Sequence, residues 1–182
     1  MALPQPETLS GTRFGLIADA HVHPGKAPPL PERLGEIFRG SDAILTLGDL
    51  GEASGLDELQ RIAPVLGVIG ADDAQGDARL TGELRVFEVS GLVMGAVFDG
   101  VKHELFASND PFQPRADLAA AVVRVFGRAL DVLLCASTHK PFVGWAAGML
   151  IVNPGSPTLA DERTVAILDV GPGFARAEHK SV

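Results

Sequence analysis

The sequence predicts an α/β sandwich whose first half contains a parallel sheet and whose C-terminal half is mostly antiparallel. Two observations lead to this fold class. In residues 13–72, strand patterns and helical patterns alternate, an order that favours parallel pairing through right-handed crossovers. From residue 82 onward short β-like runs predominate, and the first two of them form a hairpin pattern.

The elements of the first half are indicated by hydrophobic periodicity and by the residues at their ends. Buried strands are expected at residues 13–19 (RFGLIAD), 42–49 (DAILTLGD) and 65–72 (VLGVIGAD), and helices at 30–40 (LPERLGEIFRG) and 54–63 (SGLDELQRIA). Gly40 would close the first helix, and Ser54 would cap the start of the second.

The second half starts with the hairpin pattern at residues 82–100, whose turn is expected at Ser90-Gly91. The longest helical pattern covers residues 115–129, and a buried strand is expected at 131–137. Four further β-like runs are expected at residues 142–147, 149–155, 164–170 and 174–180.

Length and composition are those of one globular domain. The 182 residues are 46% hydrophobic and 21% charged, and they show no repeat or linker. We therefore expect a single domain over residues 1–182, with residues 1–12 as a loose N-terminal extension. With 15 basic and 23 acidic residues, the net charge is −8, which argues against general nucleic-acid binding.

The sequence also limits the cellular setting. Cys135 is the only cysteine, which excludes a disulfide framework and a thiolate zinc cluster, and its apolar surroundings predict a core position. The N-terminus does not resemble a signal peptide, and no apolar run reaches the roughly 18 residues of a membrane span. These features predict a cytoplasmic protein that does not associate with membranes.

The stretch LIADAHVHPGK (residues 16–26) allows two interpretations as a metal site. An H-x-H motif (His21 and His23) would suggest an amidohydrolase or a histidinol-phosphatase type of barrel, whereas a D-x-H motif (Asp19 and His21) would suggest a metallophosphoesterase. A (β/α)₈ barrel typically needs about 250 residues, so this chain of 182 residues is too short for the barrel interpretation.

Polar residues recur where the predicted strands end, which is where ligands bind in α/β sheets. After the first strand come Asp19 and His21, and the later strands are followed by GD (48–49), GADD (70–73), STHKP (137–141) and NPGSP (153–157). The barrel interpretation leaves the later segments unexplained.

This ordered set resembles the motif pattern of the calcineurin-like metallophosphoesterases, and most of all their small single-domain bacterial and archaeal phosphodiesterase branch. The match runs from Phe14 to about Ser156 in the order and spacing of the family. The resemblance implies a four-layer α/β/β/α sandwich of the metallo-dependent phosphatase type. It also implies two adjacent metal ions that share a bridging aspartate.

Carried over position by position, the resemblance leaves one metal site complete and the other incomplete. The ligands implied for the first ion are all present: Asp19, His21, Asp49 and His139. Where the second ion would have an asparagine and two histidines, this chain has Ala71, Phe98 and Ser137. Asp72 and Asp73 are conceivable substitutes, and Asp72 also occupies the place of a general acid in related phosphatases.

A set of two carboxylates and two imidazoles suits Mn²⁺, Fe²⁺, Zn²⁺ or Ni²⁺. The first hypothesis is therefore a metal-dependent phosphoesterase, more specifically a phosphodiesterase that hydrolyses a small phosphate ester with metal-activated water. Asp49, Asp72 and His139 would be its catalytic residues.

The alternative is a weakened or inactive fold that serves as a metal-binding or protein-binding module, as Phe98 at a ligand position suggests. A third hypothesis, an amidohydrolase-like site, needs His21 and His23 on one metal. His23 is expected to be exposed or to support a ligand, and Trp145 to pack in the core or in an interface. A homo-oligomer is compatible with the sequence.

Overall fold

The computed structural model describes residues 3–23, 25, 28–108 and 113–182, and these residues form two β-sheets. The five-stranded sheet has the order β11-β10-β2-β3-β4. Its strands are β2 (Arg13–Ile17), β3 (Ala43–Thr46), β4 (Val65–Gly67), β10 (Thr164–Gly171) and β11 (Phe174–Ser181). The first three pair in parallel and β10 joins them antiparallel, so the parallel half and the antiparallel tail meet in one sheet.

The six-stranded sheet has the order β1-β5-β6-β7-β9-β8. Its strands are β1 (Pro6–Thr8), β5 (Leu84–Val89), β6 (Leu92–Val97), β7 (Val132–Leu134), β8 (Phe142–Ala146) and β9 (Met149–Asn153). The predicted hairpin is confirmed: Ser90 and Gly91 both have positive φ, 51° and 81°, as a tight two-residue turn between twisted strands requires.

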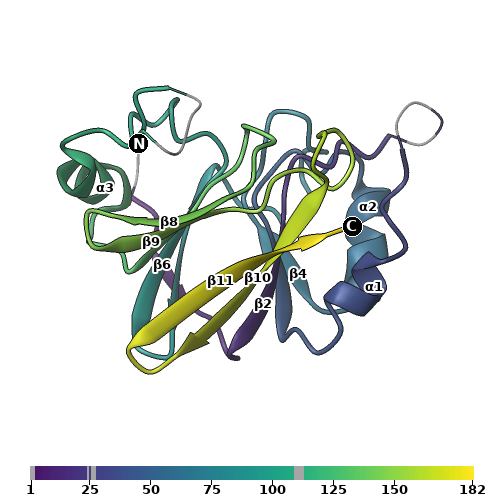
Figure 1. Ribbon diagram of the computed structural model, residues 1–182, viewed down its shortest axis with the longest axis horizontal. Coiled ribbons are helices and arrows are strands. Elements are labelled where there is room, and N and C mark those ends of the chain that lie inside the picture. Colours follow the sequence, from purple (N-terminus) through teal and green to yellow (C-terminus); the bar gives the residue numbers. More distant parts are fainter. Residues whose placement is uncertain (1–2, 24, 26–27, 109–112) are drawn as a thin grey trace.

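Alternation along the strands assigns each side chain to one of three apolar clusters. Phe14 and Leu16 of β2 face a central cluster between the sheets, while Ile17 faces α1 (Leu34–Ile37) and α2 (Ala53–Gln60). In the other sheet Leu134 faces the central cluster, and Leu133 faces α3 (Leu118–Phe126). Three apolar interfaces separate four layers, α/β/β/α, which confirms the predicted fold class (Figure 1).

The helices are shorter than the sequence pattern suggests. The first, expected at residues 30–40, has only four helical residues, because Pro31 precedes it and Gly35 lies within it. Ser54 is not the cap of α2, since Glu52 holds the extended N-cap position and Ser54 lies inside the first turn. The third helix ends as expected of a glycine C-cap, with Gly127 at a φ of 74°.

The N-terminal segment is part of the fold. The prediction of a loose extension over residues 1–12 is wrong for β1, which pairs in parallel with β5 at the edge of the six-stranded sheet. Glu7 of β1 accepts two hydrogen bonds of 2.7 Å from the guanidinium group of Arg85. This bidentate pair fastens β1 to the sheet.

Cys135 is buried in the cluster beneath α3, as expected. Trp145 was predicted to pack in the core or in an interface. It is 67% exposed on the edge strand β8, so the core is excluded and an interface stays a prediction. Among the described helices, none is long and apolar enough to cross a membrane.

Candidate metal centre

The candidate site lies where loops from both sheets meet at the carboxyl ends of their strands. The loop after β2 runs beside the loop after β3, with backbone hydrogen bonds from Asp19 to Gly48 and from His21 to Asp49. His139 comes from the loop after β7 in the other sheet. Because the two sheets pack face to face, residues far apart in the sequence reach one point.

The predicted ligands share an unusual backbone conformation. Asp19, His21, Asp49 and His139 have φ values of 51°, 47°, 51° and 56°, in the left-handed region that non-glycine residues seldom adopt. Residues in such conformations cost free energy and gather at functional sites, where the surrounding structure holds them. Ser90, Glu104, Ser137 and Ala147 share this conformation, so the strain indicates a site here only together with the convergence of the four side chains.

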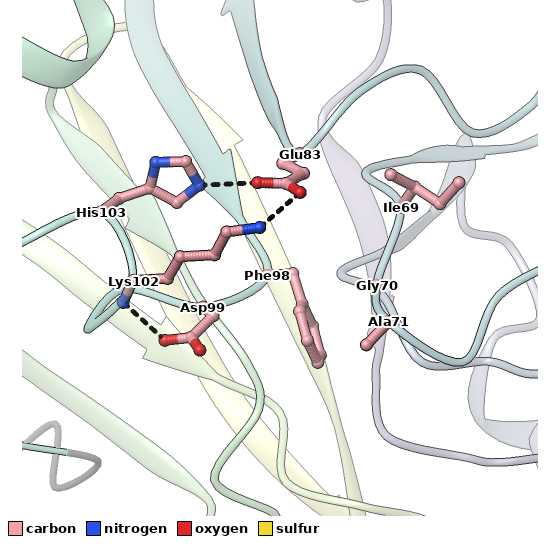
Figure 2. A pocket seen from close by; sticks show the side chains of 8 residues that line it. All are labelled: Ile69, Gly70, Ala71, Glu83, Phe98, Asp99, Lys102 and His103. Carbon is pink, nitrogen blue, oxygen red and sulfur yellow. Dashed lines mark hydrogen bonds and ion pairs between the residues drawn. The ribbon is translucent and has the colours of Figure 1, made fainter.

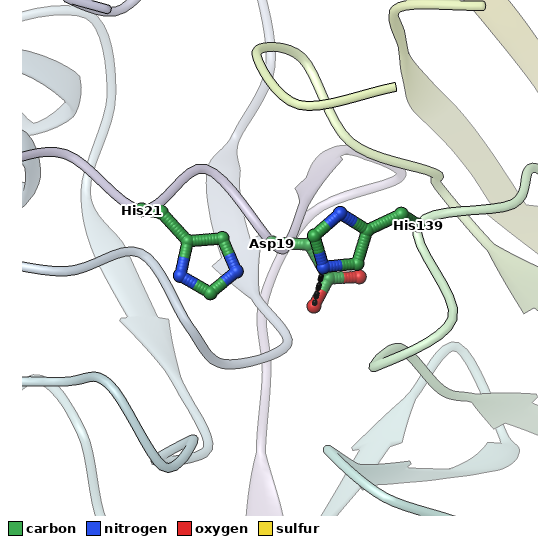
Figure 3. A group of neighbouring side chains, drawn as sticks. All are labelled: Asp19, His21 and His139. Carbon is green, nitrogen blue, oxygen red and sulfur yellow. Dashed lines mark ion pairs between the residues drawn. The ribbon is translucent and has the colours of Figure 1, made fainter. Parts of the chain in front are cut away.

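Three of the four predicted ligands form a tight group. The ligating atoms of Asp19, His21 and His139 all lie within 4.8 Å of one another, and no other such group of three occurs among the described residues (Figure 3). The two imidazole rings stack with centroids 5.2 Å apart. Burial and the neighbouring His21 lower the pKa of His139, which favours the neutral imidazole that a metal needs.

The carboxylate of Asp19 is weakly satisfied within the protein. It is fully buried, neither oxygen accepts a hydrogen bond of good geometry, and Nε2 of His139 lies 4.0 Å from Oδ1. Burial and, next, the charge of Asp49 raise the pKa of Asp19 to about 7, although the backbone N–H groups of His139 and Ser137 oppose this shift. A buried carboxylate normally has a cation or a hydrogen bond to balance it, so this donor set fits a divalent metal ion.

Asp49 lies beside the group without belonging to it. Its Oδ2 is 3.9 Å from Nε2 of His21, and its Oδ1 accepts a 2.8 Å hydrogen bond from the backbone N–H of Asp72. Burial raises the pKa of Asp49. Gly70 fits here because a Cβ at that position would lie 2.3 Å from Oδ1 of Asp49.

Asp72 holds two histidines. Its Oδ2 lies 2.7 Å from Nδ1 of His21 and 2.8 Å from Nε2 of His23. Burial raises the pKa of Asp72, but the hydrogen bonds to the two imidazoles outweigh it and hold the pKa below its usual value. With its Nδ1 bound to Asp72, His21 directs Nε2 toward the group, as in the carboxylate–histidine–metal arrangement of many metal sites.

His23 therefore supports the ligand His21 through Asp72. Its Nε2 is engaged by Asp72, and its Nδ1 lies 3.7 Å from Glu52. The amidohydrolase hypothesis required His21 and His23 on one metal, and the described structure groups His21 with Asp19 and His139 instead. The two-sheet fold also excludes the barrel.

Asp73 has a structural role and does not join the metal group. Its two oxygens accept four backbone N–H groups, at distances of 2.7 to 3.0 Å: Asp49, Leu50, Gly51 and Gly70. A carboxylate has about four acceptor positions, so none remains for an ion. Asp73 therefore fixes the loop that carries Asp49, and its role as a substitute ligand stays a prediction.

Two anchoring residues escaped the sequence analysis. The hydroxyl of Ser156 donates a 2.7 Å hydrogen bond to the backbone carbonyl of Asp19, and that of Thr158 does the same to Ala20. Both are buried, so the NPGSP segment holds the Asp19 loop from beneath. The available signal was the run of small polar residues directly after the apolar strand β9.

The side chains at the three positions implied for a second ion do not form a metal site. Ala71 and Phe98 line a common hollow next to Gly70, and neither side chain can ligate a metal (Figure 2). Ser137 lines a separate small hollow with Thr138. Among the described residues, only one group of His, Cys, Asp or Glu could hold a metal ion, and these three positions are not in it.

Comparison with known proteins identifies the class. The calcineurin-like phosphoesterase superfamily domain matches residues 13–173, and the chain therefore belongs to this family of metal-dependent phosphoesterases. It is 34% identical over 148 residues to a "Probable metallophosphoesterase" of Methanothermobacter thermautotrophicus, covering 80% of this chain and 77% of the relative. The family and this relative class the chain as a hydrolase of phosphate esters.

Solved structures agree with the fold. The zinc complex of Vps29 from Entamoeba histolytica superimposes with a TM-score of 0.69 at 20% identity, covering 93% of this chain and 98% of that one. A protein described as a novel archaeal phosphodiesterase gives a TM-score of 0.64 at 16% identity, with coverages of 92% and 99%. At these identities the likeness concerns the fold alone.

Proposed function

We propose that the protein is a phosphodiesterase that works with a single divalent metal ion held by Asp19, His21, Asp49 and His139. The observation that carries this proposal is the buried carboxylate of Asp19, which accepts no hydrogen bond of good geometry and lies within 4.8 Å of nitrogens from His21 and His139. Oxygen and imidazole donors in this mixture suit Mn²⁺, Fe²⁺, Zn²⁺ or Ni²⁺.

Asp49 completes the set as the fourth ligand. Its Oδ1 is committed to the backbone N–H of Asp72, but its Oδ2 has no such bond and faces Nε2 of His21 at 3.9 Å. An ion between these atoms would also neutralise the repulsion between Asp49 and Asp19 that raises the pKa of Asp19.

The chemistry that a divalent ion supplies is polarisation of a phosphoryl oxygen and activation of the attacking water. The protein's own contribution is positional. Asp72 orients His21, Asp73 fixes the loop of Asp49, and Ser156 fixes the loop of Asp19. The side chains that meet the substrate are thereby held by strained backbone on a rigid support.

A diester is favoured over a monoester as the substrate, because there is space on both sides of the metal group of Asp19, His21 and His139. On the His139 side lies an open hollow of about 360 Å³, to which Lys140 and Leu159 also contribute. On the Asp49 side lies the hollow of about 130 Å³ that Ala71 and Phe98 line. A phosphodiester has one substituent for each side.

The test is hydrolysis of bis-p-nitrophenyl phosphate by chelator-treated protein titrated with Mn²⁺. We expect activity that rises with metal and is lost in Asp49→Ala, while Glu58→Ala, which removes an exposed carboxyl of α2, stays active. Wild-type hydrolysis by Asp49→Ala would overturn the mechanism. Calorimetric titration of both variants with Mn²⁺ separates loss of the metal from loss of the chemistry.

A second candidate is a metal-binding or protein-binding module without catalysis. It is favoured by Phe98 at an expected ligand position and by the 67% exposure of Trp145 on an edge strand. Tight Mn²⁺ binding with no turnover of any phosphate ester would support it. Cytoplasmic location, a small substrate, lack of general nucleic-acid binding and homo-oligomerisation stay predictions.

A further inference from the structure

Figure 2 shows a hollow of about 130 Å³. It adjoins the metal centre on the Asp49 side, because Gly70 of its lining lies against Asp49. Its apolar part consists of Ile69, Gly70, Ala71 and Phe98, and its rim consists of Glu83, Asp99, Lys102 and His103. The proposed function uses this hollow only as space for one substituent of the diester and gives its side chains no role of their own. A space this small suits one planar ring rather than a drug-sized ligand.

Two glycines join this hollow to the metal centre. The ring of Phe98 lies against Gly48, where a Cβ would come 2.6 Å from its Cδ2, and Gly48 directly precedes Asp49. Gly70 lies against Asp49 itself. The Phe98 ring and the backbone of these two glycines therefore form the wall between the hollow and Asp49, which places the hollow directly beside the metal centre.

The apolar part presents an aromatic ring. Phe98 is only partly buried, and in Figure 2 its ring stands in the hollow on the side of Ala71, with Ile69 further along the same loop. A partly exposed aromatic ring beside a methyl group forms a slot for a flat group. Aromatic rings gain free energy by stacking in such places beyond the area that they bury.

The charges of the rim are already paired. Nζ of Lys102 lies 2.6 Å from one oxygen of Glu83, and Nε2 of His103 lies 3.2 Å from the other. Asp99 accepts the backbone N–H groups of Val101 and Lys102. The rim therefore has no unbalanced cation for a second phosphate, but it offers polar atoms to the edge of an uncharged ring.

We infer that this hollow, the Phe98 pocket, binds an aromatic substituent of the phosphate ester, either a phenyl group or a nucleobase, by stacking on Phe98. The inference rests on the proposed function, because it assumes a phosphate ester at the metal centre. It gives two of the three positions implied for a second ion a role: Ala71 and Phe98, which cannot hold an ion, line the specificity pocket instead.

The test compares the binding of phenylphosphonate and methylphosphonate to the full chain with Mn²⁺, measured by calorimetry. Neither probe can be hydrolysed, so the measurement does not depend on catalysis. We expect phenylphosphonate to bind about tenfold more tightly. In Phe98→Leu, which keeps an apolar side chain, this preference should fall at least about threefold, while Phe174→Leu, at an exposed turn, keeps it.

Methyl NMR signals locate the ring. Phenylphosphonate should shift the methyl signals of Ile69 and Ala71 in the wild type, and methylphosphonate should not. Equal affinities for both probes, no binding of either, or a preference that Phe98→Leu does not reduce would overturn the inference. If the protein prefers phenylphosphonate through Phe98 but hydrolyses no diester, the pocket stands and the phosphodiesterase proposal fails. If it hydrolyses diesters but shows no preference for phenylphosphonate, the phosphodiesterase proposal stands and the pocket fails.

Discussion

Nδ1 of His21 and Oδ2 of Asp72 lie 2.7 Å apart, across 51 residues of sequence. This contact decides which nitrogen of His21 faces the candidate metal group, because Nδ1 is engaged and Nε2 is left for the ion. The sequence analysis gave Asp72 a catalytic role or a place in a second metal site. Its hydrogen bond to Nδ1 of His21 also suits a positioning role for a ligand of the first ion, while the catalytic role stays a prediction.

Asp72→Asn should therefore weaken Mn²⁺ binding about 10- to 100-fold, as loss of an outer-sphere partner typically does. Calorimetric titration measures the affinity. Glu52→Gln, which removes the more distant neighbour of His23, should change it little. If Asp72→Asn kept wild-type metal affinity but lost turnover, Asp72 would be a proton donor rather than a positioning residue.

Asp73 should matter for stability more than for metal binding. Removing its carboxylate leaves four backbone N–H groups around Asp49 without a partner, and several of them are buried. At about 1–3 kcal/mol for each unsatisfied buried group, Asp73→Ala should lose more than about 3 kcal/mol of unfolding free energy. Urea denaturation measures this loss.

Asp99→Ala serves as the matched control, because Asp99 accepts only two backbone N–H groups in a loop near the surface. It should lose clearly less stability than Asp73→Ala. A nearly wild-type unfolding free energy in Asp73→Ala, combined with loss of one bound metal ion, would support the substitute-ligand interpretation.

Ser156→Ala should loosen the Asp19 loop. The buried carbonyl of Asp19 would lose its 2.7 Å hydrogen bond, at a cost of about 1–3 kcal/mol. Because Asp19 is held at a φ of 51°, some of this loss should also appear as weaker metal binding. Thermal unfolding with and without Mn²⁺ separates the loss of stability from the loss of metal binding. If Ser156→Ala lowers the unfolding free energy by the same amount with and without Mn²⁺, the loop keeps its shape without Ser156.

The four layers of the fold and the metal group of Asp19, His21 and His139 could be predicted from the sequence and its ordered motifs. Strand patterns such as that of β10 alternate strictly between two apolar interfaces, and the ordered motifs place Asp19, His21 and His139 at strand ends. Both are local signals. The pairing of β1 with β5 was not predictable, because three residues, PET, carry no periodicity and their attachment depends on a distant arginine, Arg85.

The roles of the two neighbouring aspartates also depended on distant contacts. Asp72 and Asp73 are adjacent in sequence, yet one points to imidazoles and the other to four backbone amides. Nothing in GADD distinguishes them, since either could face the site. The choice between core and interface for Trp145 was open for a related reason: a strand pattern does not reveal that its strand lies at the edge of a sheet.

The buried charge of Asp19 predicts that metal-free protein loses stability as the pH rises. The pKa of Asp19 is about 7 in the folded protein and has a reference value of 3.8. Between these values the unfolded chain has released the proton and the folded chain still holds it. Because the unfolded state then binds fewer protons, the unfolding free energy falls from about pH 4 to about pH 7 and is lowest above pH 7.

Asp19→Asn removes this titration. In the presence of a chelator it should be more stable than the wild type at pH 8, by at most about 4 kcal/mol, and the difference should vanish near pH 4. The gain stays below that figure because a buried amide at the same place also lacks partners.

Added Mn²⁺ should make the wild type more stable than Asp19→Asn, since the ion stabilises only the protein that can bind it. Urea denaturation from pH 4 to 8 measures each case, with Glu58→Gln expected to follow the wild type. Parallel curves for the wild type and Asp19→Asn without metal would show that Asp19 is ionised in the metal-free fold and balanced by some other group.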